Sequence, residues 1–252
     1  MAKLRIPTPP RTGEPIFDKG DHILQGGSSA DILMISSRDF ALKVDGGAGL
    51  DWVVFTDGSI KFDMRKSGAQ NTGFGTHTIT SVENVITSTI GTGRDSIKGN
   101  SSKNVIITGQ GNDRIDAGGG DDVIFAGTGK DTVTGGAGKD YFVFDGNLNK
   151  RTNVDTITDF KKKSDKFVLS RSGLDEDGKK VDIFMKAGTP GVLKKGAFYV
   201  GSKAHDKDDR IIYNKKTGVL YYDPDGNGSK AQVEFANLKN KASITVSDFY
   251  LA

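Results

Sequence analysis

An acidic residue recurs at nine-residue intervals between residues 90 and 143, and this spacing constrains the fold more than any other feature of the chain. The acidic positions are Asp95, Asp113, Asp122, Asp131 and Asp140, and Asn104 occupies the one step that carries no aspartate. Two residues after each of these six positions comes an apolar side chain: Ile97, Ile106, Ile115, Ile124, Val133 and Phe142. A fixed period is typical of repeat architectures, in which each unit stacks on its neighbours.

Glycines crowd the positions before most of these acidic residues, as in the hexad from Gly135 to Asp140. Glycine adopts positive φ at little cost, so each hexad is expected to form a tight turn with exposed carbonyls. The three residues that follow then form a very short strand with one inward apolar side chain. Two nonapeptides make one coil, so residues eighteen apart stack. The expected edges are Asp95, Asp113 and Asp131 on one side, and Asn104, Asp122 and Asp140 on the other.

The predicted stacking brings like charges together. Carboxylates that lie one strand spacing apart repel one another unless a cation lies between them. Carboxylate and backbone carbonyl oxygens are hard ligands of the kind that Ca²⁺ prefers in proteins. The repeats therefore predict several calcium ions between successive coils.

The pattern G-G-x-G-x-D-x-apolar-x resembles the repeats-in-toxin (RTX) nonapeptide. The resemblance implies an all-β fold, a right-handed parallel β-roll of Gly/Asp nonapeptide repeats, in which turn carbonyls and aspartates of adjacent coils hold each ion. The implied ligands are Asp95, Asp113, Asp122, Asp131 and Asp140, with Asn104 and backbone oxygens at Gly109, Gly118, Gly127 and Gly136. Because the amide of Asn104 brings no charge, sites that touch it are expected to bind calcium more weakly.

Residues 21–90 resemble a degenerate set of the same repeats. Residues 46–53 match the nonapeptide completely, which makes Asp51 an expected calcium ligand, whereas residues 26–33 match only in part and leave the role of Asp31 open. Trp52, the only tryptophan, is expected to pack, with a stacking platform for a sugar as the alternative. His77 stands where the pattern often carries aspartate, so we expect no full calcium site there.

The chain divides into three predicted parts. Residues 1–20 hold four of the six prolines and are expected to form a flexible arm. Residues 21–147 form the β-roll, with degenerate repeats over 21–90 and regular nonapeptides over 91–143. Residues 148–252 form a β-rich C-terminal cap and secretion-signal region, whose first part resembles the cap that follows the roll in secreted proteases, lipases and epimerases. Asp155, Asp159 and Asp165 in that part either bind one more ion or lie on the surface.

A second calcium-binding pattern lies near the C-terminus. Asp223, Asp225 and Asn227 fall at the first, third and fifth positions of an EF-hand-type loop, and Glu234 falls at its twelfth. The flanks are predicted strands rather than helices, with a hairpin expected over residues 210–223. The segment is therefore either a strand-flanked calcium loop or a plain turn.

Composition and chain ends bear on location. The chain has no cysteine, and no apolar run approaches the roughly 20 residues of a membrane span. The N-terminus lacks the apolar region of a secretory signal peptide. Asp248 followed by Phe249–Ala252 resembles the uncleaved signal that type I ABC-transporter exporters read. These features predict an extracellular protein that leaves a Gram-negative cell through a type I secretion apparatus.

The favoured function is a secreted calcium-binding protein that folds on extracellular Ca²⁺ and has no catalytic activity of its own. The alternative is an adhesin or an effector that contacts membrane, cell surface or anionic polysaccharide, since residues 148–252 carry 20 basic and 14 acidic residues. An exoenzyme is favoured least, because G-x-S-x-G, H-E-x-x-H and G-x-x-x-x-G-K-[ST] are all missing from the sequence. Nucleic acid is not an expected partner, because the lysines do not interleave with aromatic residues in a known binding motif.

Overall fold

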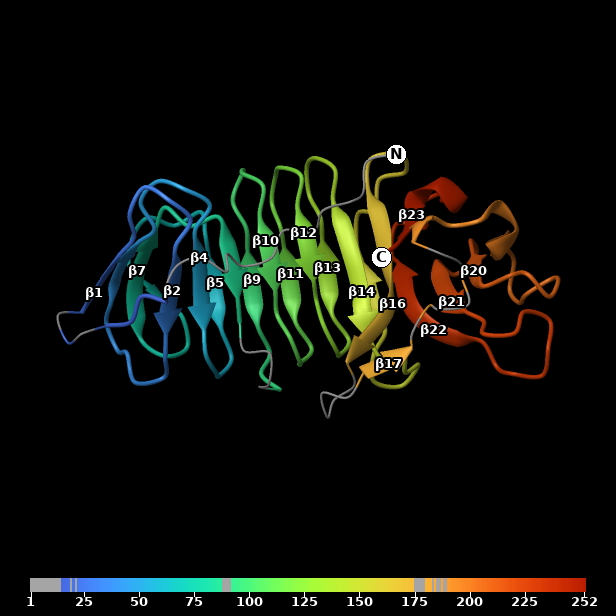
Figure 1. Cartoon of the computed structure of the whole chain (residues 1–252), viewed down its shortest axis with the longest axis horizontal. Coiled ribbons are helices and arrows are strands. Elements are labelled where there is room, and N and C mark those ends of the chain that lie inside the picture. Colours follow the sequence, from blue (N-terminus) through green and yellow to red (C-terminus); the bar gives the residue numbers. More distant parts are fainter. Residues whose placement is uncertain are drawn as a thin grey trace.

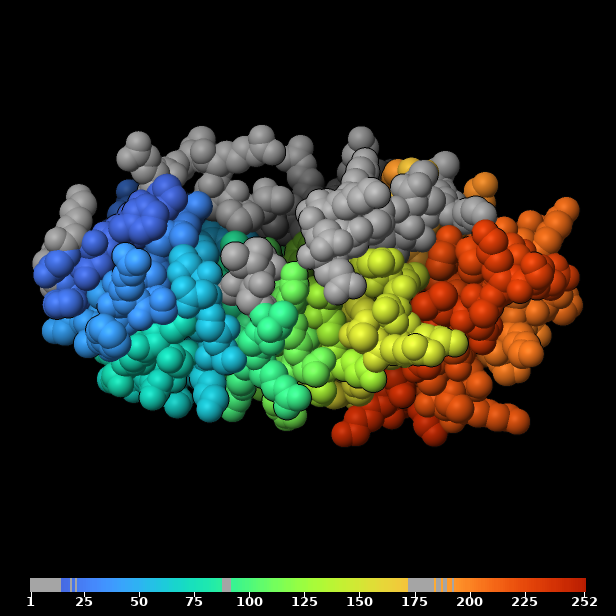
Figure 2. Space-filling view, turned by 90° about the horizontal axis from the view of Figure 1, so that it is seen from below, coloured from blue at the N-terminus to red at the C-terminus, as the bar shows by residue number. Residues whose placement is uncertain are grey.

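Short parallel strands stack along the long axis of the molecule in two sheets that share one apolar core (Figure 1). The computed structural model describes residues 15–18, 20, 22–87, 92–174, 180–182, 184, 187 and 190–252. Most of the predicted N-terminal arm, residues 1–14 and 19, lies outside the described residues. From β8 (Asn84–Ile86) to β16 (Lys166–Leu174) the sequence runs along the long axis, and β22 (Val233–Leu238) and β23 (Phe249–Leu251) then return to pair with β15 (Asp155–Ile157) and β16, so that red lies beside yellow in Figure 2. Each coil therefore contacts mainly its two neighbours, as the nine-residue period requires.

The ten-stranded sheet has the strand order β18-β23-β16-β14-β12-β10-β8-β4-β2, and β17 pairs with β16. Its strands are β2 (Ile32–Ile35), β4 (Trp52–Phe55), β8 (Asn84–Ile86), β10 (Val105–Ile107), β12 (Val123–Phe125), β14 (Tyr141–Gly146), β16 (Lys166–Leu174), β17 (Lys180–Asp182), β18 (Gly191–Val192) and β23 (Phe249–Leu251).

The nine-stranded sheet has the order β19-β20-β21-β22-β15-β13-β11-β9-β5. Its strands are β5 (Lys61–Asp63), β9 (Ser96–Lys98), β11 (Arg114–Asp116), β13 (Thr132–Thr134), β15 (Asp155–Ile157), β19 (Phe198–Val200), β20 (Ile211–Asn214), β21 (Val219–Tyr222) and β22 (Val233–Leu238). A four-stranded sheet at the N-terminal end joins β1 (Ile23–Gln25), β3 (Lys43–Asp45), β7 (Thr76–Thr80) and β6 (Gln70–Asn71). Single 3-10 turns, η2 (Lys195–Ala197) and η3 (Val246–Asp248), precede β19 and β23.

The predicted eighteen-residue coil is confirmed by the strand register. Consecutive strands from β9 to β14 alternate between the two sheets, and each pairs with the strand two further along the chain. Val105 thus pairs with Val123 in one sheet, and Arg114 pairs with Thr132 in the other. The six apolar residues of the repeat all point into the shared core and are at most 2% exposed: Ile97, Ile106, Ile115, Ile124, Val133 and Phe142. The all-β parallel β-roll predicted from the repeats is the fold that forms.

Tight turns of the repeats depend on glycine for two reasons. Gly109, Gly118, Gly127 and Gly136 have φ values of 79°, 97°, 82° and 93°, which side chains rarely adopt. Successive turns also approach closely: a Cβ added at Gly127 would lie 1.8 Å from the carbonyl oxygen of Gly109. Glycine at this position therefore fixes the spacing between coils as well as the turn.

Bulky aromatic side chains close the core after the last glycine repeat. The rings of Phe160 and Phe167 stack with centroids 4.4 Å apart, and Phe167 stacks on Phe249 at 4.9 Å. Both sheets of the roll continue through this region without a break, since β16 and β23 extend one sheet and β22 to β19 extend the other. The predicted hairpin is present as the antiparallel pair β20 and β21. The boundary placed at residue 147 stays a prediction.

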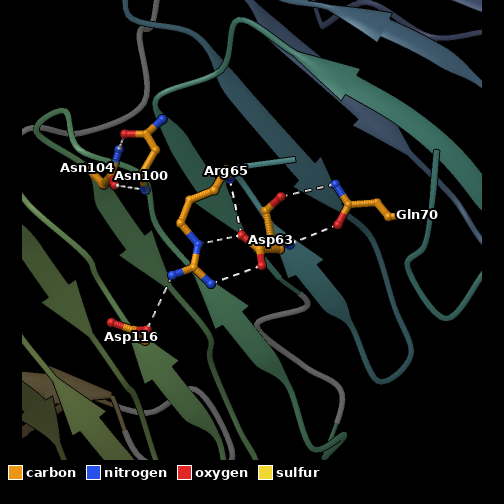
Figure 3. Close-up of polar contacts among 6 residues, drawn as sticks. All are labelled: Asp63, Arg65, Gln70, Asn100, Asn104 and Asp116. Carbon is orange, nitrogen blue, oxygen red and sulfur yellow. Dashed lines mark hydrogen bonds and ion pairs between the residues drawn. The ribbon is translucent and has the colours of Figure 1, made fainter. Parts of the chain in front are cut away.

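An ion pair on the outer face ties two coils of the nine-stranded sheet together (Figure 3). The guanidinium of Arg65 forms two hydrogen bonds to Asp63, at 2.8 and 3.0 Å, and its Nη1 lies 3.8 Å from Asp116 Oδ2. The side-chain oxygen of Gln70 accepts a hydrogen bond from the Asp63 N–H, and the side-chain NH₂ of Gln70 donates one to the Asp63 carbonyl. In this cluster an arginine, rather than calcium, bridges carboxylates of β5 and β11, the strands on either side of β9.

Substitution of Gly127 by alanine is expected to lower the free energy of unfolding by about 2 kcal/mol or more, because positive φ and contact with the Gly109 carbonyl both oppose a Cβ. Gly68→Ala is the matched control, since a Cβ there meets nothing within 4 Å, and it should change stability by less than about 0.5 kcal/mol. Urea unfolding in saturating Ca²⁺ measures both. Equal effects of the two substitutions would contradict the role given to Gly127.

Candidate metal centre

A ladder of aspartates links the coils on the side of the nine-stranded sheet. Asp95, Asp113 and Asp131 directly precede a strand, whereas Asp155 is the first residue of one. The Oδ1 of each accepts the backbone N–H of the equivalent residue one coil earlier. The Asp95 N–H donates to Asp113 at 2.8 Å, the Asp113 N–H to Asp131 at 2.7 Å, and the Asp131 N–H to Asp155 at 3.2 Å. The first ladder is therefore Asp95, Asp113, Asp131 and Asp155, and all four residues are buried.

A second ladder runs along the ten-stranded sheet. The Asn104 N–H donates to Asp122 Oδ1 at 2.8 Å, the Asp122 N–H to Asp140 at 3.2 Å, and the Asp140 N–H to Asp165 at 3.2 Å. The arrangement also reaches into the degenerate repeats, where Asp51 accepts the Asp31 N–H at 2.8 Å. The second ladder is defined here as Asp51, Glu83, Asn104, Asp122, Asp140 and Asp165. The predicted alignment of side chains eighteen residues apart is thus present along both edges.

Glu83, Asp155 and Asp165 are ladder members whose positions the nonapeptide spacing does not give. The Oε2 of Glu83 accepts the Asp51 N–H at 3.0 Å. Asp155 and Asp165 lie 24 and 25 residues after Asp131 and Asp140, because the intervening turns are longer. Both are buried, so a surface role for them is wrong. Asp159 instead accepts the N–H groups of Gly135 and Gly136 at 2.9 and 2.8 Å.

Five ladder carboxylates each keep one oxygen that is buried and has no hydrogen-bond partner in the described part of the chain: the Oδ2 atoms of Asp51, Asp113, Asp122, Asp131 and Asp140. A buried acceptor without a partner costs roughly 1–3 kcal/mol, and more when it is charged. A cation between the coils removes that cost and offsets the repulsion between carboxylates. The donor set is made only of oxygen, which suits Ca²⁺. The residues present therefore fit calcium.

Burial shifts the titration of these carboxyl groups strongly. Burial, aided by neighbouring aspartates, raises the pKa of Asp113 to about 7, of Asp122 to about 8 and of Asp140 to about 6. Asp131 and Asp155 face each other across one coil spacing, and burial raises the pKa of both. Without a cation, protons are the remaining counter-charge for the ladders near neutral pH.

Not every predicted ligand is equally free to bind an ion. The second oxygen of Asp95 accepts a hydrogen bond from the hydroxyl of Thr87. The side-chain amide of Asn104 donates to the carbonyl of Glu83 at 2.7 Å. It also donates to Asn100 at 3.1 Å (Figure 3). An amide group thus provides the positive hydrogen atoms that a cation would otherwise bring between these coils. Calcium ligation by Asp95 and by Asn104 stays a prediction.

The glycine carbonyls also take part in links between coils. The carbonyl of Gly109 accepts the Thr128 N–H at 2.8 Å, and that of Gly118 accepts the Ala137 N–H at 2.9 Å. A carbonyl oxygen has a second lone pair, so these bonds leave room for a metal. Ligation by the backbone at Gly109, Gly118, Gly127 and Gly136 remains a prediction, as does ligation by the ladder side chains.

The EF-hand-type segment forms a compact loop between β21 and β22. Asp223 is buried, and its Oδ1 accepts the Asp225 N–H at 3.2 Å, while Asp225 Oδ2 accepts the Lys230 N–H at 3.1 Å. The Asn227 N–H donates to the carbonyl of Asp206 at 3.0 Å. Glu234 lies within β22 opposite Tyr221. Calcium binding by Asp223, Asp225 and Asn227 is still a prediction.

A cluster that the sequence analysis missed lies beside that loop. Ligand atoms of His205, Asp206 and Asp209 lie within 4.8 Å of one another. Asp206 Oδ1 accepts the N–H groups of Asp208 and Asp209, and Asp209 Oδ2 accepts those of His205 and Asp206. The H-D-x-x-D spacing was the available sequence signal. These bonds explain the cluster as a turn that its own side chains stabilise.

Two further expectations concern the degenerate repeats. Trp52 is 2% exposed and packs with Val105, Val123, Val143 and Val168, so it is a packing residue and no platform for a sugar. His77 is fully buried, and its Nδ1 accepts the Leu42 N–H at 3.1 Å, the bond that an aspartate makes elsewhere in the roll. Burial lowers the pKa of His77, which favours the neutral ring that this bond requires.

The fold and the ladders define a parallel β-roll with stacked carboxylates between its coils. A family model described as the RTX calcium-binding nonapeptide repeat (4 copies) matches residues 89–124 and 116–147. Residues 89–147 of this chain are thus RTX calcium-binding repeats. A search of curated proteins found no match.

Two solved structures match this chain at low identity and low TM-score. The AlgE6R3 subunit of the Azotobacter vinelandii mannuronan C5-epimerase is 22% identical, with a TM-score of 0.36, and the match covers 62% of this chain and 77% of that one. The extracellular lipase LipA from Serratia marcescens is 14% identical, with a TM-score of 0.35, over 91% of this chain. This chain spans 40% of the lipase's length.

Acid is expected to stabilise the calcium-free protein. Because folding raises the pKa of the ladder carboxyl groups above about 3.9, the stabilisation from their protonation is complete below that pH. It is lost as pH rises through about 6 to 8, the folded-state values of Asp140, Asp113 and Asp122. In EDTA, the free energy of unfolding should therefore be higher at pH 5 than at pH 8 by at least about 1.4 kcal/mol, the equivalent of one pKa unit. The folded fraction of the calcium-free chain, followed by far-UV circular dichroism from pH 5 to pH 8, measures it, and a larger folded fraction at pH 8 would contradict the expectation.

Proposed function

We propose that this chain is a secreted calcium-binding protein that folds when it meets extracellular Ca²⁺ and has no catalytic activity of its own. The observation that carries the proposal is the set of five buried carboxylate oxygens without hydrogen-bond partners among the described residues, all in the two ladders. The side chains of Asp51, Asp113, Asp122, Asp131 and Asp140 would hold the ions. Calcium supplies the positive charge that lets these groups stay ionised and buried together.

Calcium binding and folding are then one equilibrium. Each ladder site needs oxygens from two successive coils, so no site exists in the unfolded chain. An ion present at 100 times its Kd adds about 2.7 kcal/mol to the free energy of unfolding, and several ions add this amount several times. Cytosol that is poor in calcium favours the unfolded chain, and the extracellular space favours the roll.

A link to export supports the secreted location. Phe249 and Leu251, from the segment that resembles a type I export signal, are 1% exposed and belong to β23, which pairs with β16 in the ten-stranded sheet. A transporter can therefore read this segment only before the sheet forms. Coupling of folding to calcium would keep the segment accessible inside the cell. None of the helices in the described residues is long and apolar enough to cross a membrane.

A groove on the roll favours saccharide binding as the second candidate function. Its cavity of about 400 Å³ is lined by polar side chains from successive turns, including Arg94, Gln110, Asn112, Asn149 and Thr152. Amide and hydroxyl groups can hydrogen-bond to sugar hydroxyls, and an arginine can bind a carboxylate. An acidic polysaccharide should bind here, and Arg94→Gln should weaken that binding at low salt. No binding of the polysaccharide at low salt would remove this candidate.

The chelator-treated chain is expected to change cooperatively from disordered to β structure when Ca²⁺ is added, whereas Mg²⁺ should leave it disordered, since Mg²⁺ gives up its water reluctantly. Far-UV circular dichroism measures this change, and the fluorescence of buried Trp52 gives a second probe. A calcium-free chain that is already folded at pH 7.5 and does not respond to Ca²⁺ would contradict the proposed function.

Asp131→Asn is expected to raise the calcium concentration at the folding midpoint about tenfold, which corresponds to about 1.4 kcal/mol. Asp131 is buried with an unpartnered oxygen and belongs to the first ladder. Asp57→Asn is the matched control, since Asp57 lies exposed on the same roll and accepts a hydrogen bond from Ser37. The control should leave the midpoint within a factor of two. Equal midpoints for both variants would exclude Asp131 as a ligand.

A further inference from the structure

The segment from Phe160 to Asp165 is a repeat turn in which lysine has replaced glycine. Its strand pairs in register with the last regular repeat, since Tyr141 opposes Lys166. Asp165 accepts the Asp140 N–H at 3.2 Å, as Asp140 accepts that of Asp122. The sequence FKKKSDKFV therefore aligns with GGAGKDYFV, and Lys161 occupies the place that Gly136 holds one coil earlier.

The backbone of this turn reproduces the earlier turns. Lys161 N–H donates to Asp165 Oδ2 at 2.7 Å, as Asn100 N–H donates to Asn104 Oδ1 at 3.0 Å. Lys163 has a φ of 70°, in the place where Gly138 has a φ of 125°. A lysine in the left-handed region is uncommon, so packing in the roll imposes the turn even without glycine.

The two carbonyls that this turn faces already have partners. Lys161 Nζ donates to the carbonyl of Gly136, one of the predicted backbone ligands. Ser164 Oγ donates to the carbonyl of Gly138 at 2.7 Å. Of the lysines in the described part of the chain, Lys161 is the one whose ammonium group donates a hydrogen bond to a glycine carbonyl of the repeat turns.

The positive charge of Lys161 also acts on the two ladder carboxylates of these two turns, Asp140 and Asp165. The Lys161 ammonium attracts the carboxylates of Asp140 and Asp165 electrostatically. The ammonium group thus makes one contact that an ion would make, with a turn carbonyl, and it lies in the electrostatic field of two ladder carboxylates.

We propose that the Lys161 ammonium occupies the last cation position of the second ladder, between residues 135–140 and residues 160–165, so that calcium does not bind there. This inference rests on the proposed calcium binding by the ladders. Once the roll folds, this last pair of turns then needs no calcium to close, while the earlier pairs of turns close only when ions bind.

The test counts calcium ions per folded chain, by equilibrium dialysis with elemental analysis, for the whole protein and its variants. Lys161→Gly restores the repeat glycine and removes the ammonium, so it should bind one calcium ion more than the wild type. Lys161→Arg keeps the charge and should bind the same number as the wild type. Lys162→Gly is the matched control: Lys162 is the exposed neighbour in the same turn, and its substitution should not change the number either.

Asp165→Asn gives an independent test that does not depend on the folding of the Lys161 variants. If Lys161 fills the last cation position, the substitution leaves the calcium count unchanged; the loss of one ion would overturn the inference. The same calcium count in Lys161→Gly and the wild type would also overturn it. A wild type that binds no calcium would instead refute the proposed function, so the two failures are distinguishable.

Discussion

The structure depends on the hydrogen bond between a ladder carboxylate and the backbone N–H one coil earlier. Strand pairing in each sheet is only three residues long in most coils, so little else fixes the turns on the outside of the core. The carboxylate of Asp113 or Asp131 spans the gap at 2.7–2.8 Å and sets the register of successive turns. The same bond buries the carboxylates in line, where their charges repel. Geometry and electrostatics are therefore opposed until a cation joins the ladder.

Positions of the roll at which another residue replaces the ladder aspartate show which part of the aspartate's role needs a negative charge. His77 makes the same type of bond through Nδ1, and Glu83 makes it with a longer side chain. The Asn104 side chain adds donors of its own and bonds to Asn100 and Glu83 without any ion. The bond to the neighbouring N–H thus tolerates several acceptors, but the unpartnered second oxygen occurs at aspartates. The unpartnered second oxygens are therefore the atoms that a bound cation would satisfy.

The sequence predicted the coil because one period fixes three things together. Nine residues set the half-coil, glycine sets the turn, and the residue two places after the aspartate sets the inward face, as Ile97 to Phe142 show. The sequence did not predict the ladder members that lie where the nine-residue period is interrupted. Glu83, Asp155 and Asp165 reach the ladders after longer connections, and only pairing in the sheets reveals their register. The bond of Lys161 to Gly136 depends on a side-chain path that no spacing in the sequence specifies.

The two ends of the regular repeats differ in what holds them together. Coils built on Ile97, Ile115 or Val133 bury one aliphatic side chain per nonapeptide, which contributes about 1.5–3 kcal/mol against the entropy of nine ordered residues. At the C-terminal end the core is instead aromatic, with Phe160, Phe167 and Phe249 in one stack.

Lysine side chains supply positive charge at the C-terminal end of the regular repeats. Lys166 Nζ lies 3.8 Å from the fully buried Asp248, and Lys161 contacts the last glycine turn. Larger apolar burial and built-in cations make this end the part of the roll that needs calcium least. Ordered coils should therefore spread from it toward the N-terminus as ions bind, since each newly formed coil completes the sites shared with the next.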